Sequence, residues 1–186
     1  RGYFNHPTAY ILLVVFLSII YFFYFRPVLI TGETTLRPLF DILPWILMFY
    51  VPAVTMGLVA KEKNDGTLEI LMTQPIKPWQ IIIGKALSAF LFISFSLLIT
   101  LSIPFSLAHF GDFDYGLIFS QYLGSLFLIA GLVAIGLWAS AITKNQIIAF
   151  ISSMAVNFLL IFIGFEMVTT SLPYPFNLIF KKVSIL

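Results

Sequence analysis

The sequence predicts an all-α, polytopic helical membrane protein. Three observations favour this fold class: 60% of the 186 residues are hydrophobic, only 10% are charged, and the mean hydropathy is +1.03. Soluble domains carry about 25% charged residues, and a soluble fold of this size would need more polar surface to cover its core. The long apolar runs are therefore expected to be transmembrane helices.

Five apolar runs are long enough to cross a bilayer, because each residue advances a helix by about 1.5 Å and the hydrocarbon core is about 30 Å thick. We expect spans at residues 9–25, 42–60, 81–110, 115–142 and 146–168. Pro52 and Pro104 lie in the second and third runs, where the missing backbone donor is expected to kink or end the helix. Residues 26–41 are rich in polar residues and helix breakers, which predicts a connection between the first two spans.

Several classes of active site are excluded by the sequence. It has no cysteine, so it cannot form a disulfide, a thiolate metal site or a cysteine nucleophile. Gly84 and Lys85 resemble the end of a phosphate-binding loop, but that motif needs an earlier glycine where Trp79 stands and a hydroxyl where Ala86 stands. The chain is therefore not expected to be an enzyme that hydrolyses ATP.

The acidic and histidine side chains near the end of the third span do not indicate a metal centre. His109, Asp112 and Asp114 are close in sequence, but two carboxylates and one histidine in an outer turn are typical of a solvated loop. We expect neither a metal ion nor a cofactor.

Residues 61–85, between the second and third spans, hold seven of the eighteen charged side chains. Lysine and arginine are enriched in cytoplasmic loops, and the predicted topology divides the charges unequally. One side carries Arg1, Lys61, Lys63, Lys77, Lys85 and Lys144, and the other carries Arg26, Arg37, Asp112 and Asp114. The N-terminus and residues 61–85 are therefore expected to be cytoplasmic, in a multi-pass protein of a cell membrane.

A short helix is expected within this loop, at about residues 67–74. The turn at residues 64–67 offers capping side chains, and Glu69 lies in the first helical turn, where the helix dipole favours a negative charge. Leu68, Leu71 and Met72 fall on one face, and Pro75 would end the helix. So short a helix is marginal in water, so its apolar face must lie either on lipid headgroups or on a protein partner.

The same residues resemble the E-(K/R)-x-x-G-T-x-E-x-L-x-x-x-P…G-K region of ABC-type-2 transporter permeases. The matching positions are Glu62, Lys63, Gly66, Thr67, Glu69, Leu71, Pro75, Gly84 and Lys85. Residues 3–10, 36–38 and 143–146 look like the gliding-motility and nitrous-oxide-reductase-maturation branch of these permeases. The resemblance extends over essentially the whole chain, as one permease domain.

The resemblance implies a coupling helix that binds a separate ATP-binding cassette subunit, in a transporter with two permease copies. The residues it implies for ATPase contact, or for shaping the turn, are Glu62, Gly66, Thr67, Leu68, Glu69, Leu71, Met72 and Pro75. It also implies a helix before the first span and a sixth span after the fifth. Both are expected to be missing from this sequence, as if it were truncated at both ends.

Polar residues in the fifth span are candidates for a translocation path, because polar groups in hydrocarbon usually face protein or a cavity. They are Ser152, Ser153, Asn157 and Glu166. The alternative is that Asn157 only hydrogen-bonds a neighbouring helix. Small residues in the fourth span, including Gly136 and Ser140, are expected to allow close helix packing.

The expected function is that of the transmembrane subunit of an ABC exporter, with alternating access driven by ATP hydrolysis in a partner subunit. Two alternatives remain at this stage. The first is that the chain anchors a larger membrane machine, such as a gliding apparatus, without cargo of its own. The second is that the chain is an unrelated membrane enzyme or channel. The apolar spans make lipid an expected partner. Nucleic acid is not expected to bind, because the net charge is only +2.

Overall fold

The computed structural model describes residues 7–31, 36–72, 77–107 and 115–164, and every regular element within them is an α-helix. The helices are α1 (Pro7–Thr31), α2 (Arg37–Thr55), α3 (Gly57–Asn64), α4 (Thr67–Met72), α5 (Pro78–Ile99), α6 (Ser102–Leu107), α7 (Tyr115–Ile142) and α8 (Gln146–Gly164). They supply five stretches that are long and apolar enough to cross a membrane, with α2–α3 and α5–α6 each counting as one. The predicted all-α fold with five visible spans is confirmed.

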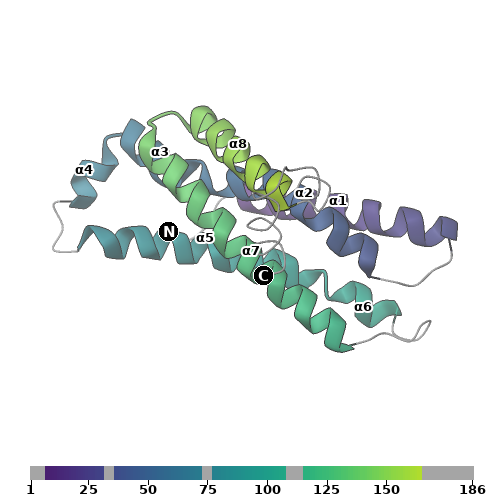
Figure 1. Cartoon of the computed structure of the whole chain (residues 1–186). Coiled ribbons are helices and arrows are strands. Elements are labelled where there is room, and N and C mark those ends of the chain that lie inside the picture. The colour runs from purple at the N-terminus through teal and green to yellow at the C-terminus, as the bar shows by residue number, and fades with distance from the viewer. Residues whose placement is uncertain (1–6, 32–35, 73–76, 108–114, 165–186) are drawn as a thin grey trace, which may run out of the picture.

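Successive spans run in opposite directions (Figure 1). The starts of α5 and α8, the end of α7, and the short helices α3 and α4 gather at one end of the bundle. The end of α1, the starts of α2 and α7, and α6 lie at the other end. The lysines of residues 61–85 and Lys144 therefore belong to elements at one end, as the charge pattern predicts.

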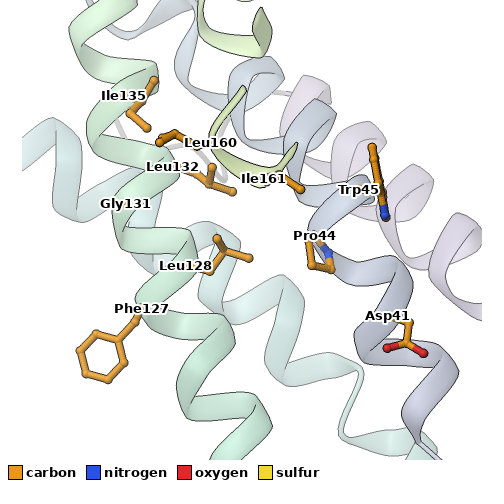
Figure 2. A pocket seen from close by; sticks show the side chains of 10 residues that line it. All are labelled: Asp41, Pro44, Trp45, Phe127, Leu128, Gly131, Leu132, Ile135, Leu160 and Ile161. Carbon is orange, nitrogen blue, oxygen red and sulfur yellow. The ribbon is translucent and has the colours of Figure 1, made fainter. Parts of the chain in front are cut away.

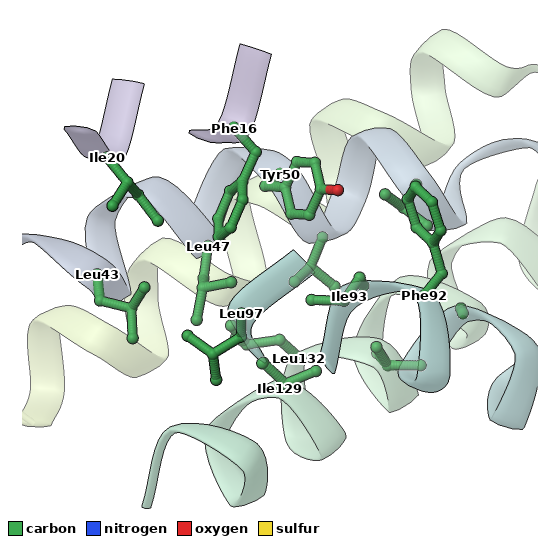
Figure 3. Close-up of a cluster of buried hydrophobic side chains, with 14 of the residues drawn as sticks. Phe16, Ile20, Leu43, Leu47, Tyr50, Phe92, Ile93, Leu97, Ile129 and Leu132 are labelled. Carbon is green, nitrogen blue, oxygen red and sulfur yellow. The ribbon is translucent and has the colours of Figure 1, made fainter. Parts of the chain in front are cut away.

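Helix α2 lies at the centre of the bundle, where it packs against α1, α5, α7 and α8. It is the most enclosed span, and α1 and α8 are the least enclosed. Figure 3 shows the core around it, in which Phe16 of α1 stacks on Tyr50 of α2 with ring centroids 4.3 Å apart. Ile93 of α5 and Ile129 of α7 are fully buried in the same cluster. The outward faces of α1 and α8 are apolar and exposed, as lipid contact requires.

The first connection is shorter than the sequence suggests. Residues 26–41 were expected to form a polar loop, but α1 continues to Thr31 and α2 begins at Arg37. Pro27 removes only one backbone donor and its ring fixes a φ that a helix accepts, while the apolar residues after it extend the span. Pro38 lies in the first turn of α2, where proline is favoured.

The third span is interrupted one turn before Pro104. Because Pro104 has no N–H, it cannot bond to the carbonyl of Thr100, four residues earlier. The chain instead forms shorter i→i−3 bonds, with the Thr100 and Leu101 amides donating over 3.0 and 3.1 Å and the Ile103 amide donating to Thr100 over 3.0 Å. The Thr100 side chain also bonds the Tyr122 hydroxyl of α7 at 3.0 Å. This is the kink expected from Pro104.

Candidate functional site

Helix α3 ends in a left-handed turn that sets the direction of α4. The Asp65 amide donates to the Lys61 carbonyl at 2.9 Å, and Gly66 follows with a φ of +70°. This is the usual helix end with glycine in the left-handed region. Thr67 then opens α4, and its hydroxyl donates to the Glu62 carbonyl at 3.4 Å. The sequence predicted a turn here, but as a source of capping side chains rather than as the end of a preceding helix.

Helix α4 is a short projection that packs against α3. Thr67 and Glu69 are exposed, while Leu68 and Leu71 are partly buried. Met72 is the last residue of the helix, and Pro75 lies outside the described residues. Leu68 and Leu71, two residues of the apolar face that the sequence predicted, are therefore only partly covered. Figure 1 shows α4 at one end of the bundle.

Two lysines connect α3 to neighbouring spans. Lys85 of α5 forms an ion pair with Glu62 and also donates to the Leu58 carbonyl. Lys63 donates to the Ala141 carbonyl near the end of α7, where a cation is favoured by the helix dipole. Glu62 is partly exposed and is paired with Lys85. The sequence offered Lys85 as a cytoplasmic charge and as part of a family motif, but did not show this partner.

The second span is interrupted at Met56, and a serine of α7 bonds to the interrupted backbone. Ser140 Oγ donates to the Met56 carbonyl at 2.9 Å and accepts the amides of Val59 and Ala60, each at 3.1 Å. Ser140 is fully buried. The sequence grouped it with small packing residues, because nothing in a linear pattern shows which backbone a serine will meet.

Gly136, one turn before Ser140, allows α7 to touch α2 directly. A Cβ atom at Gly136 would lie 2.1 Å from Thr55 Oγ1 and 2.9 Å from Thr55 Cβ. Thr55 is also fully buried and its hydroxyl donates to the Val51 carbonyl at 2.9 Å. The predicted close helix packing by small residues is found at this position.

Comparison with known proteins identifies the class to which this arrangement belongs. Residues 29–180 match the family described as ABC-2 family transporter protein. The chain belongs to the ABC-2 transporter family. Membership in this transporter family agrees with the five candidate membrane spans.

Two curated relatives are named as ABC transporter permeases. The protein "Probable multidrug ABC transporter permease YbhR" from Escherichia coli K12 is 36% identical over 106 residues, as is its counterpart from Escherichia coli O157:H7. The match covers 54% of this ABC-2 chain but only 27% of each relative. No solved structure matches the chain.

The candidate path residues of this ABC-2 protein differ in their surroundings. Ser152 donates within its own helix, to the Ile148 and Ala149 carbonyls at 2.8 and 3.1 Å. Ser153 and Asn157 are buried, and within the described chain their side-chain polar atoms have no hydrogen-bond partner. The interhelical bond considered for Asn157 is therefore not found among described residues. Glu166 lies outside them.

An apolar groove runs between α2, α7 and α8, with a volume of about 480 Å³ (Figure 2). Its lining residues are Asp41, Pro44, Trp45, Phe127, Leu128, Gly131, Leu132, Ile135, Leu160 and Ile161. Asp41 is the charged residue among these described lining residues. A groove of this volume falls in the range of sites for small organic molecules, which is about 300–1,000 Å³.

No group of three potential metal-binding side chains occurs among the residues that the structure describes. His109, Asp112 and Asp114 lie outside that part, so the expectation of an ordinary loop there stays a prediction.

Proposed function

We propose that the chain is the transmembrane permease subunit of an ABC exporter. ATP binding and hydrolysis in a separate nucleotide-binding subunit drive it between inward-facing and outward-facing states. A second permease copy completes the translocation path. The observation that carries this proposal is α4, a six-residue helix at the end of the bundle in which Leu68 and Leu71 are only partly buried.

Helix α4 suits a protein partner because so short a helix is weakly stable by itself. Glu69 is exposed and Leu68 and Leu71 keep part of their surface free, so these three residues are the proposed ATPase contacts. Thr67, Met72 and Pro75 belong to the same proposed surface. Glu62 and Gly66 act instead on the shape of the turn, because Glu62 is paired with Lys85 and Gly66 has a left-handed conformation.

The orientation follows from the lysines gathered at the α4 end of the bundle. We propose that this end is cytoplasmic, with the N-terminus on the same side of a prokaryotic plasma membrane. An ATPase subunit in the cytoplasm then meets α4 directly. The finer resemblance to the gliding-motility and nitrous-oxide-reductase-maturation branch stays a prediction.

A hydrophobic small molecule is the proposed cargo. The apolar groove between α2, α7 and α8 has a suitable volume, and the name of the curated relatives refers to multidrug transport. Ser153 and Asn157 are proposed as polar positions of the path, since buried polar groups without a partner are costly in an apolar interior. Ser152 and Glu166 remain candidates on sequence grounds.

The test is retention of the ATPase subunit by affinity-purified full-length protein. Glu69→Lys reverses an exposed charge and Leu71→Asp places a charge on the apolar face, so each should lower retention at least fivefold. Asp65→Lys is the matched control: it makes the same charge change in the adjacent turn, at an exposed position, and should retain the ATPase.

Unchanged retention in both α4 variants would contradict the proposed coupling role. A different outcome would favour a membrane anchor without cargo. In that case the wild-type protein retains the ATPase, but no hydrophobic substrate changes the rate of ATP turnover.

A further inference from the structure

The arm formed by α3 and α4 (residues 57–72) follows α2 directly after the interruption at Met56. In an uninterrupted helix the amides of Val59 and Ala60 would donate to the carbonyls of Thr55 and Met56. Here both amides donate to Ser140 Oγ, and Ser140 in turn donates to the Met56 carbonyl. A side chain of α7 therefore bonds the backbone of the second span at its interruption and in the first turn of α3.

The hydroxyl of Ser140 has no bonding capacity left. A serine hydroxyl offers one donor and two acceptor positions, and Ser140 uses all three on backbone groups of the interruption. The site is fully buried, so water cannot replace these bonds, and a buried polar group without a partner is costly. The position of α7 relative to the arm is consequently well defined.

Further contacts with α7 lie on either side of Ser140. Gly136 lets α7 approach Thr55 so closely that a Cβ atom on this glycine would lie only 2.1 Å from Thr55 Oγ1. Lys63 of the arm donates to the Ala141 carbonyl. The arm and the end of α2 thus meet α7 at three positions within little more than one helical turn.

We propose that Ser140 is a positioning residue for coupling, which makes α7 move together with the arm when the ATPase displaces α4. This inference rests on the proposed function and adds to it the helix that receives the motion. Because α7 forms one wall of the apolar groove, its movement would change the groove directly.

The experiment measures nucleotide-dependent distances between spin labels in the full-length protein bound to its ATPase. The described chain contributes no native cysteine that would take a label. Asn64→Cys reports the arm and Ser120→Cys reports the far part of α7, each paired with Ser18→Cys on α1; all three positions are exposed. Excess unlabelled protein ensures that a complex carries one labelled chain.

In the otherwise unaltered protein, both distances should shift when a non-hydrolysable ATP analogue is added. With Ser140→Ala the arm should still shift, while the shift at the α7 label is lost. Ser125→Ala is the matched control: it removes another buried serine of α7, whose hydroxyl donates at 2.8 Å within its own helix to Gln121. That variant should keep both shifts.

A second pair of variants tests the packing of α7 on Thr55 and leaves the hydroxyl of Ser140 in place. Gly136→Ala should separate α7 from Thr55 and abolish the α7 shift, and adding Thr55→Gly should restore it by exchanging the small residue between the helices.

The outcomes separate the two proposals. Two outcomes would overturn this inference alone. In one, the α7 label shifts as before in both Ser140→Ala and Gly136→Ala. In the other, the α7 label does not move in the unaltered protein while the arm does. An arm that does not respond to nucleotide in an intact complex would overturn the proposed function and this inference with it.

Discussion

Gly66 shows how one residue determines the geometry of the proposed ATPase contact. Its φ of +70° is a conformation that costs an L-residue with a Cβ atom about 1–2 kcal/mol. A Cβ atom added to Gly66 would meet no other atom within 4 Å, so the restriction comes from the backbone and not from crowding. The residue is needed for the direction of the chain rather than for packing.

Gly66→Ala should therefore loosen the turn and speed amide hydrogen exchange in α4 by about fivefold to thirtyfold, the range that 1–2 kcal/mol implies. Gly66→Asn should have a smaller effect, because asparagine tolerates the left-handed conformation. Gly84→Ala is a control, since Gly84 lies within α5 with open space around it. Hydrogen exchange followed by mass spectrometry measures all three, and equal exchange in the Ala and Asn variants of Gly66 would contradict the backbone argument.

At the scale of helices, proline positions in the sequence were informative about where spans are interrupted. Pro104 was expected to kink the third span, and the chain leaves α-helical geometry one turn earlier, at the carbonyl that Pro104 cannot bond. The second span is less simple. Pro52 lies inside α2, whereas the interruption comes at Met56, where Ser140 of another helix supplies the hydrogen bonds.

Pro104→Ala should restore the missing donor and straighten the third span. Labels at the exposed residues Gln80 and Ser106 should then move farther apart in a spin-label distance measurement. Pro78→Ala is the control, because Pro78 lies in the first turn of α5, where no backbone donor is needed. A distance that stays the same after Pro104→Ala would show that tertiary contacts, such as that between Thr100 and Tyr122, maintain the kink without the proline.

For the whole molecule, the fold class and the number of visible spans followed from hydropathy, since the bilayer requires long apolar helices. A short helix at about residues 67–74 was also predicted from local signals, and α4 is described over Thr67–Met72. The contacts of the site were not, because Ser140 and Lys63 act on backbone groups of distant helices. A backbone carbonyl or amide has no sequence signature, so such partners become visible only in the folded structure.

The topology leads to a labelling prediction. Cysteines placed at Asn64 and Lys144 should react with a membrane-impermeant maleimide only after bacterial cells are permeabilised, because their end of the bundle is proposed to be cytoplasmic. A cysteine at the exposed residue Ile30, at the opposite end, should react in intact cells. The reverse labelling pattern would contradict the proposed orientation.

The two-residue turn between α3 and α4 also determines the direction in which the proposed ATPase contact faces. Asp65 and Gly66 are all that separates the two helices, and each residue of an α-helix turns the chain by about 100°. Inserting or deleting one residue here would point Glu69 and Leu71 in a different direction without altering either helix. Turn length is thus a simple variable that would reorient the proposed ATPase contact while leaving the bundle unchanged.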